Sequence, residues 1–95
     1  MVIVTGSVTA RPDTFETLLD AALAHVRRSR LEEGCLLHSV MVDAENPLRL
    51  VFFEQWSDRA ALEAHFRQPG SGEFMSAVRE LAAESTRVQT FEVAP

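Results

Sequence analysis

Apolar residues follow two different patterns along the chain. Some stretches are rich in β-branched and aromatic residues, which is typical of strands, and others repeat apolar residues every three or four positions, as an amphipathic helix does. The first pattern predicts strands at residues 2–10, 35–42, 51–56 and 86–93. The second predicts helices at residues 13–31, from residue 59 to before residue 69, and across residues 74–82. This β-α-β-β-α-α-β order predicts an α+β, ferredoxin-like subunit with an antiparallel four-stranded sheet.

Cap and turn residues mark the boundaries of these elements. Asp13, with Glu16 three residues later, is a variant of the capping box and predicts the start of the first helix. Gly34 is expected to adopt the left-handed conformation that ends this helix. Residues 43–47 predict the turn of a hairpin, and the Gly-Ser-Gly sequence at residues 70–72 predicts a flexible link between the second and third helices.

The second and third predicted strands lack a clean alternation of polar and apolar residues, so both faces of the sheet should be covered. One layer of helices covers only one face. The other face therefore predicts a homodimer, with Phe91 and Val93 contributing to the contact. Residues 1–95 are expected to form one domain, which would be marginal as a monomer because a chain of this size buries only about 60–65% of its unfolded surface.

A candidate site lies where the third strand meets the second helix. Phe52, Glu54 and the only tryptophan, Trp56, share one face of the strand, and Ser57 or Asp58 should cap the helix. The apolar stripe of this helix consists of Leu62, His65 and Phe66. We expect Trp56 and His65 to line one cavity, within about 10 Å of each other. The residues expected nearby are Phe52, Glu54, Phe66 and Phe74.

Composition removes several classes of function. The net charge is −5 and the nine basic residues are scattered arginines, so no basic stripe for nucleic acid is present. The absence of lysine excludes Schiff-base chemistry on a lysine. No apolar run approaches the roughly 20 residues that cross a bilayer, and the first residues lead into a strand, so a cytoplasmic protein with no membrane partner is expected. The single Cys35 excludes an internal disulfide.

No cofactor motif is present: the chain has no glycine-rich dinucleotide loop, no phosphate loop and no HExxH zinc motif. The three histidines, at positions 25, 38 and 65, stand too far apart in sequence to predict a local metal cluster. His25 borders the stripe of the first helix and is interpreted as structural. We therefore expect neither a cofactor nor a metal.

Four short motifs occur in order along the chain: Glu33-Gly34-Cys35, Glu54-Gln55-Trp56, Ala60-Ala61-Leu62 and Ala64-His65. The first lies within the segment EEGCLLHSVMVD, residues 32–43. Together they resemble the antibiotic biosynthesis monooxygenase (ABM) domain family over nearly the whole chain. The resemblance implies a ferredoxin-like subunit that pairs into a dimeric α/β barrel. It also implies small cofactor-independent enzymes that act on quinol-like or polyketide aromatics, although relatives include haem-degrading enzymes and an isomerase.

The chain departs from this family at three places. Thr5-Gly6-Ser7 stand where haem-degrading relatives have an asparagine, which disfavours haem. Phe52 stands where monooxygenases with polyketide substrates have an asparagine, four residues before the tryptophan. Residues 70–72 replace a second histidine that is common in relatives. These departures remove polar residues that the resemblance implies for an oxygenase site.

Three functions stay open: a cofactor-independent monooxygenase of a quinol-like or polyketide-type aromatic small molecule, a His65-dependent isomerase, and a non-catalytic dimeric ligand-binding module. Reaction of triplet O2 with a singlet molecule is spin-forbidden, so the monooxygenase needs an electron-rich substrate that a base can deprotonate. His65 suits that base. Glu54 is a second candidate if burial raises its pKa, but a carboxylate near a strand end can also pair with an arginine or a backbone amide. The catalytic candidates are His65, Trp56 and Glu54. The substrate-binding candidates are Phe52, His38, Phe66 and Phe74. Each of these residues can also be interpreted simply as part of the core. Phenylalanine at position 52 favours the isomerase and the ligand-binding module over the monooxygenase.

Overall fold

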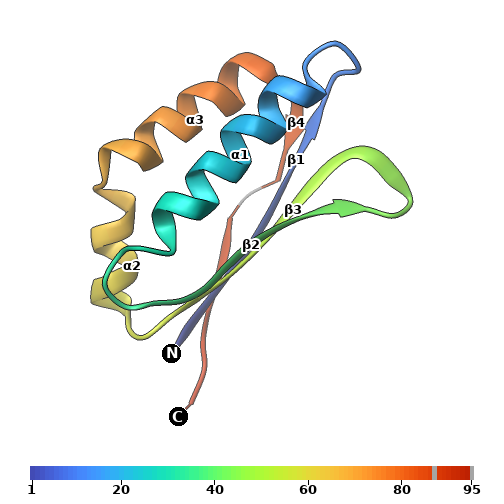
Figure 1. Cartoon of the computed structure of the whole chain (residues 1–95). Coiled ribbons are helices and arrows are strands. Elements are labelled where there is room, and N and C mark those ends of the chain that lie inside the picture. The colour runs from blue at the N-terminus through green and yellow to red at the C-terminus, as the bar shows by residue number, and fades with distance from the viewer. Residues whose placement is uncertain (87, 95) are drawn as a thin grey trace.

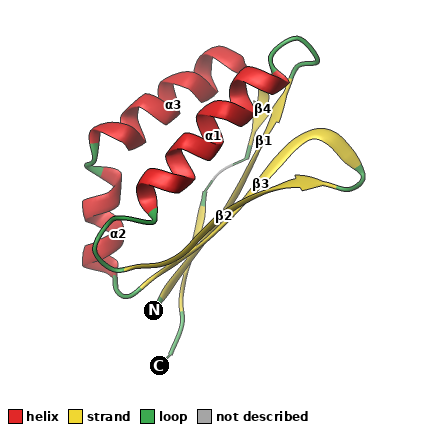
Figure 2. Cartoon of the chain, in the orientation of Figure 1, coloured by secondary structure: helices red, strands yellow, loops and turns green. Residues whose placement is uncertain are grey.

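A computed structural model describes residues 1–86 and 88–94. One antiparallel sheet lies on one side of the molecule and all three helices lie on the other (Figures 1 and 2). The strands are β1 (Val2–Ala10), β2 (Cys35–Asp43), β3 (Asn46–Trp56), β4 (Ala82–Ser85) and β5 (Gln89–Glu92). The helices are α1 (Phe15–Ser29), α2 (Arg59–Phe66) and α3 (Pro69–Leu81). The predicted α+β, ferredoxin-like class is confirmed.

The sheet has the order β2-β3-β1-β4. β4 pairs with the end of β1, and β5 pairs with the beginning of β1. The single strand predicted at residues 86–93 is therefore wrong: the chain forms two short strands that follow the same edge of β1. Between them the Ser7 N–H donates to the Thr86 hydroxyl (2.8 Å), so a side chain takes the place of a backbone acceptor in the ladder. Residue 87, which the prediction also included, lies outside the described residues.

The first helix begins at Phe15, and the predicted capping box is wrong. Asp13 is exposed and lies near Arg11 instead of capping the helix. Thr14 stands at the N-cap, where its hydroxyl donates to the Leu81 carbonyl (2.7 Å) and so ties the start of α1 to the end of α3. Gly34 has the predicted positive φ, +83°, but α1 already ends at Ser29, so Gly34 turns the chain into β2.

The second helix begins where predicted, because the Asp58 carboxylate accepts from the Ala61 N–H (2.8 Å) and caps it. The predicted flexible link at residues 70–72 is wrong, since these residues form the first turn of α3. Pro69 suits the first position of a helix, and the Ser71 hydroxyl donates to the His65 carbonyl (2.6 Å). The two helices are therefore joined tightly.

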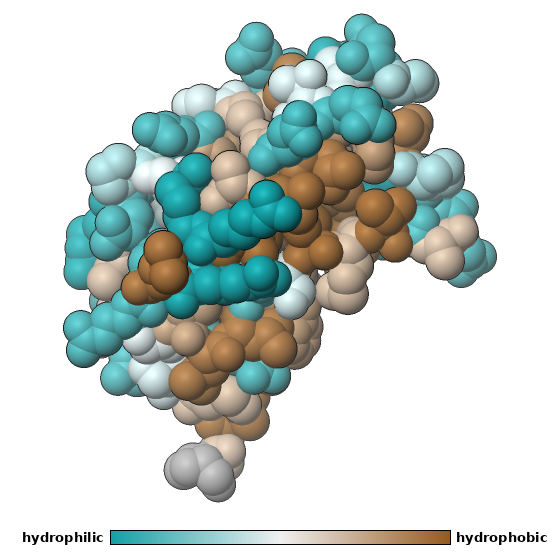
Figure 3. Space-filling model, viewed as in Figure 1, coloured by the Kyte–Doolittle hydropathy of each residue, from teal (hydrophilic) through white to brown (hydrophobic). Residues whose placement is uncertain are grey.

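The core lies between the sheet and the helices. Residues of β1 and β3 that face the helices are buried: Leu50 and Phe52 pack with α1 and α3, and Trp56 packs with Leu62 of α2. The other face of the sheet is also rich in apolar side chains that remain half-buried or exposed in one chain: Ile3, Met41, Val51, Phe53 and Phe91. Hydrophobic patches are visible on the surface in Figure 3. Among the described residues, no helix combines the length and the apolar composition that a bilayer span requires.

Candidate functional site

A cavity of about 140 Å³ lies between the sheet and the helices. An apolar cavity of about 150 Å³ holds one benzene ring, so this space fits a single aromatic ring. The titratable residues in its lining are His25, Glu54 and His65. Apolar residues from β1, β3, α2, α3 and the chain before β5 form much of its lining, including Val4, Val8, Phe52, Phe66, Phe74, Met75, Val78 and Val88.

The helix-facing side of β3 positions the first part of the site. Phe52, Glu54 and Trp56 are all buried on that side, as the alternation along the strand predicts. The Trp56 Nε1–H donates to Glu54 Oε1 (2.9 Å), and His38 Nε2 lies 3.3 Å from the same oxygen. His38 stands directly opposite Glu54 in the register of β2 and β3.

These contacts set the charge of Glu54. Burial acts to raise the pKa of this carboxyl, but the contacts with His38 and Trp56, aided by the nearby His65, outweigh burial and hold the pKa below its ordinary value. Glu54 is thus ionised at neutral pH. The expectation of a raised pKa is therefore wrong in direction. The alternative expected an arginine or a backbone amide as the partner, but the partners are the Trp56 indole and the His38 imidazole.

The second helix positions His65 at the edge of the cavity. Its Nδ1 lies 2.9 Å from Oε1 of Glu32, a residue of the loop between α1 and β2. Because an ionised carboxylate only accepts hydrogen bonds, Nδ1 is the donor, and in the neutral ring Nε2 carries the lone pair. The ring centres of Trp56 and His65 are 4.6 Å apart, so the predicted proximity of these two residues is confirmed.

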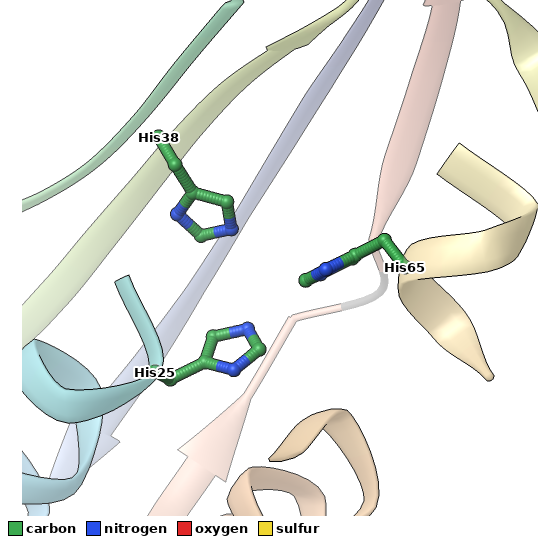
Figure 4. A group of neighbouring side chains, drawn as sticks. All are labelled: His25, His38 and His65. Carbon is green, nitrogen blue, oxygen red and sulfur yellow. The ribbon is translucent and has the colours of Figure 1, made fainter. Parts of the chain in front are cut away.

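All three histidines of the chain meet at one place (Figure 4). His25 comes from α1, His38 from β2 and His65 from α2, and one nitrogen from each ring lies within 4.8 Å of the others. The inference that these residues are too widely spaced to form a cluster is therefore wrong. Distance along the chain does not measure distance in space, and three different elements bring the rings together.

The environments of His25 and His38 differ from those of solvated histidines. His25 stacks on Phe74 with 4.7 Å between ring centres. Burial, with His38 and His65 adding to it, lowers the pKa of His25 to about 4, so its ring is neutral at pH 7. His38 is 1% exposed, and neither of its ring nitrogens has a hydrogen-bond partner among the described residues. The approach of Nε2 to Glu54 is close but not aligned as a hydrogen bond.

The candidate residues divide into two layers. Phe52, Glu54, His65, Phe66 and Phe74 line the cavity. Phe66 is 53% exposed and so lies partly in solvent, where an inward position was expected. Trp56 and His38 are buried but do not line the cavity, and the expectation that Trp56 forms its wall is wrong. Glu54 and His65, both in contact with Trp56, line the cavity in its place.

Two functional candidates, Glu32 and His25, were missed by reasoning on the sequence. His25 lies between Ala22 and Val26 of the buried stripe of α1, a position that already pointed inward. Glu32 gives no signal in sequence, because it belongs to a loop whose path depends on packing against α2.

Comparison with known proteins identifies relatives over most of the chain. The sequence model of the family described as antibiotic biosynthesis monooxygenase matches residues 1–77. An uncharacterised protein of Synechocystis, sll1783, is 30% identical over 93 residues; this covers 98% of the present chain, which spans only 63% of the length of that protein.

Solved structures show the same fold. A candidate antibiotic biosynthesis monooxygenase of Deinococcus radiodurans has 25% identity and a TM-score of 0.94, with 100% of this chain and 94% of that chain covered. Rv0793 of Mycobacterium tuberculosis has 26% identity and a TM-score of 0.90, with 99% and 95% covered. PA3566 of Pseudomonas aeruginosa has 26% identity and a TM-score of 0.87, with 99% and 94% covered.

Proposed function

Because the chain belongs to the antibiotic biosynthesis monooxygenase family, we propose that it is a cofactor-independent monooxygenase of a single-ring, quinol-like aromatic molecule. One observation carries the proposal: a largely apolar cavity of about 140 Å³ is lined by a histidine whose Nδ1 is held by a carboxylate. The volume favours a single ring over the fused rings of a polyketide aromatic.

In the proposed reaction His65 acts as the base. Its Nε2 accepts the proton of a phenolic hydroxyl, and Glu32 stabilises the resulting imidazolium through Nδ1. The electron-rich phenolate then donates an electron to O2, which avoids the spin barrier. One oxygen atom enters the ring and the other leaves as water, so a hydroquinone and O2 give a hydroxyquinone and water. The substrate supplies all four electrons.

The other candidates hold the substrate or the base in place. Phe52 and Phe74 are 5.5 Å apart between ring centres and nearly edge to face, a surface against which a flat ring packs well. Trp56 acts through Glu54, whose ionised carboxylate it fixes, and is a positioning residue in this proposal. Phe66 covers the ring from its half-exposed position.

Oxygen consumption with a panel of single-ring hydroquinones and one three-ring anthrone tests this function. We expect uptake with the hydroquinones, and we expect His65→Ala to lower turnover by about 10²–10⁴-fold, the usual contribution of a general base. Glu63→Ala, an exposed change on the same helix, is the matched control and should leave turnover unchanged. Circular dichroism of each variant separates lost catalysis from lost folding.

Two results would contradict the oxygenase. Binding of the hydroquinones without oxygen uptake would identify a ligand-binding module. Proton exchange on an enolisable ligand, again without oxygen uptake, would identify a His65-dependent isomerase.

We also propose that the chain works as a cytoplasmic homodimer, joined through the sheet face opposite the helices into a dimeric α/β barrel. The apolar side chains on that face support the pairing, since burying them on a second copy removes them from water. The single cysteine supports the compartment, because the chain has no internal disulfide that an oxidising environment would maintain.

A further inference from the structure

The histidine cluster has chemistry that the proposed oxygenase does not use. All three rings point to a common centre from α1, β2 and α2, and all three residues are buried, with 6%, 1% and 3% exposure for His25, His38 and His65 (Figure 4). A small domain seldom buries three imidazoles against one another without a reason, because each ring has two polar nitrogens that need partners.

We propose that His25, His38 and His65 form a binding site for one divalent transition-metal ion, of which zinc is the reference case. Three neutral imidazoles suit zinc, copper, nickel or iron, whereas magnesium and calcium prefer oxygen ligands. Three histidines with one free coordination position are a known arrangement for zinc in proteins.

The distances allow such a site after a small movement. In a triangle with sides of 4.8 Å, the largest separation between the nitrogens, the centre would lie about 2.8 Å from each corner. A tetrahedral zinc with bonds of about 2.0–2.1 Å holds its nitrogens about 3.3 Å apart, so each nitrogen must move inward by about 0.9 Å. Small rotations about side-chain bonds provide a movement of that size without a change in the backbone.

The surrounding carboxylates prepare the rings for a cation. Glu32 holds Nδ1 of His65 and leaves Nε2 free to bind, which is the usual support of a metal-bound histidine. Glu54 lies 3.3 Å from His38 Nε2. The two negative charges match the two positive charges of the ion, so binding would not leave a net charge buried.

His38 is the residue that most requires a partner. Both of its nitrogens are buried without a hydrogen-bond partner among the described residues, and such groups carry a desolvation penalty. A metal ion bound to one of these nitrogens gives that nitrogen a partner. His25 and His65 line the cavity, so the cluster borders that space.

Metal binding and the proposed proton transfer exclude each other, since both use the lone pair of His65 Nε2. The site is therefore tested by binding itself, independently of any turnover. If the oxygenase proposal fails, the binding result still stands, and the reverse also holds.

The experiment titrates the full chain, first treated with EDTA, with Co²⁺ and then with Zn²⁺. We expect one Co²⁺ per chain, with the visible absorption of a four-coordinate site, and displacement by one Zn²⁺. His38→Phe keeps a buried ring but removes both nitrogens, and should weaken zinc binding by more than about 100-fold. Cys35→Ser should bind as the wild type does, which excludes the nearby thiol as the ligand.

Neighbouring glutamates give a matched pair. Glu32→Gln should weaken zinc binding by about 10–100-fold, the usual effect of losing a carboxylate behind a ligating histidine. Glu33→Gln changes an exposed residue and should have no effect.

If His38→Phe does not fold, nitrogen NMR of the wild type decides the question, because the chain has only these three imidazoles. One equivalent of Zn²⁺ should shift a ring nitrogen of all three histidines. The proposal is overturned if the folded chain takes up no Zn²⁺ at 0.1 mM or so, if folded His38→Phe binds as tightly as the wild type, or if the imidazole nitrogens do not shift.

Discussion

Gly34 occupies a position where no other residue fits well. Its φ is +83°, and an added Cβ would lie 2.5 Å from the Ala61 Cβ and 2.7 Å from the Ser57 Oγ. The loop that carries Glu32 therefore approaches α2 at this point through backbone alone. The Gly34 carbonyl also accepts from the Ser57 N–H (2.8 Å), which fixes the loop against the start of α2.

We expect Gly34→Ala to lower the free energy of unfolding by about 1–3 kcal/mol, because it combines left-handed strain with a steric clash. Gly72→Ala is the matched control: it lies in α3 with nothing within 4 Å of the added Cβ, and should stabilise by up to about 1 kcal/mol. Urea unfolding measures both. Equal stability of the two variants would contradict the tight contact between the loop and α2.

The direction of individual side chains could be predicted on β3 but not on β2. Alternation placed Phe52, Glu54 and Trp56 together correctly, because β3 runs without irregularity through these residues. The register of β2 against β3 shifts between Cys35 and Leu37. A shift of one residue moves every later side chain to the other face, so the inward position of His38 depends on a bulge that its own sequence does not reveal.

The β2-β3 hairpin is held at its tip by Asp43. This carboxylate accepts from the Glu45 N–H and from Arg49 Nη1, both at 2.9 Å. The Glu45 amide, with Arg49 adding to it, lowers the pKa of Asp43 below its ordinary value. The folded hairpin thus binds the ionised form.

The free energy of unfolding should therefore fall in acid, because Asp43 becomes protonated. A carboxyl whose pKa is lowered by folding contributes fully above its unfolded pKa, near 4, and loses that contribution as the pH falls through the folded value. We expect Asp43→Asn to lower the melting temperature at pH 7, and the difference from the wild type to disappear toward pH 2. Asp20→Asn, an exposed change on α1, should show no such dependence. A difference that persists at pH 2 would show that Asp43 acts without its charge.

Helix and strand boundaries were predictable where a local hydrogen bond sets them. Asp58 was a correct cap because its carboxylate bonds three residues ahead. The start of α3 was missed, since two glycines suggested a link while Pro69 and the Ser71 bond to the His65 carbonyl made a helix. The division of the last strand depends on Ser7 and Thr86, residues 79 positions apart, and no local pattern contains that information.

The whole molecule presents an apolar sheet face that pairing would cover. We expect a dimer in light scattering at micromolar concentration, and we expect Phe53→Asp or Val51→Asp to give a monomer or an unfolded chain, because an unpaired buried carboxylate costs several kcal/mol. Leu31→Asp is the control, since Leu31 is 88% exposed in the loop between α1 and β2. A wild-type monomer, or a Phe53→Asp dimer of normal stability, would contradict pairing through this face.

Trp56 gives the chain an optical reporter. It is the only tryptophan, and the chain has no tyrosine, so near-ultraviolet emission comes from a single indole. That indole donates its N–H to Glu54 and lies 4.6 Å from the His65 ring. A cation, a proton or an aromatic guest that reaches the cluster must change the field around this one chromophore. Fluorescence of the unlabelled protein therefore follows occupancy of the site in real time.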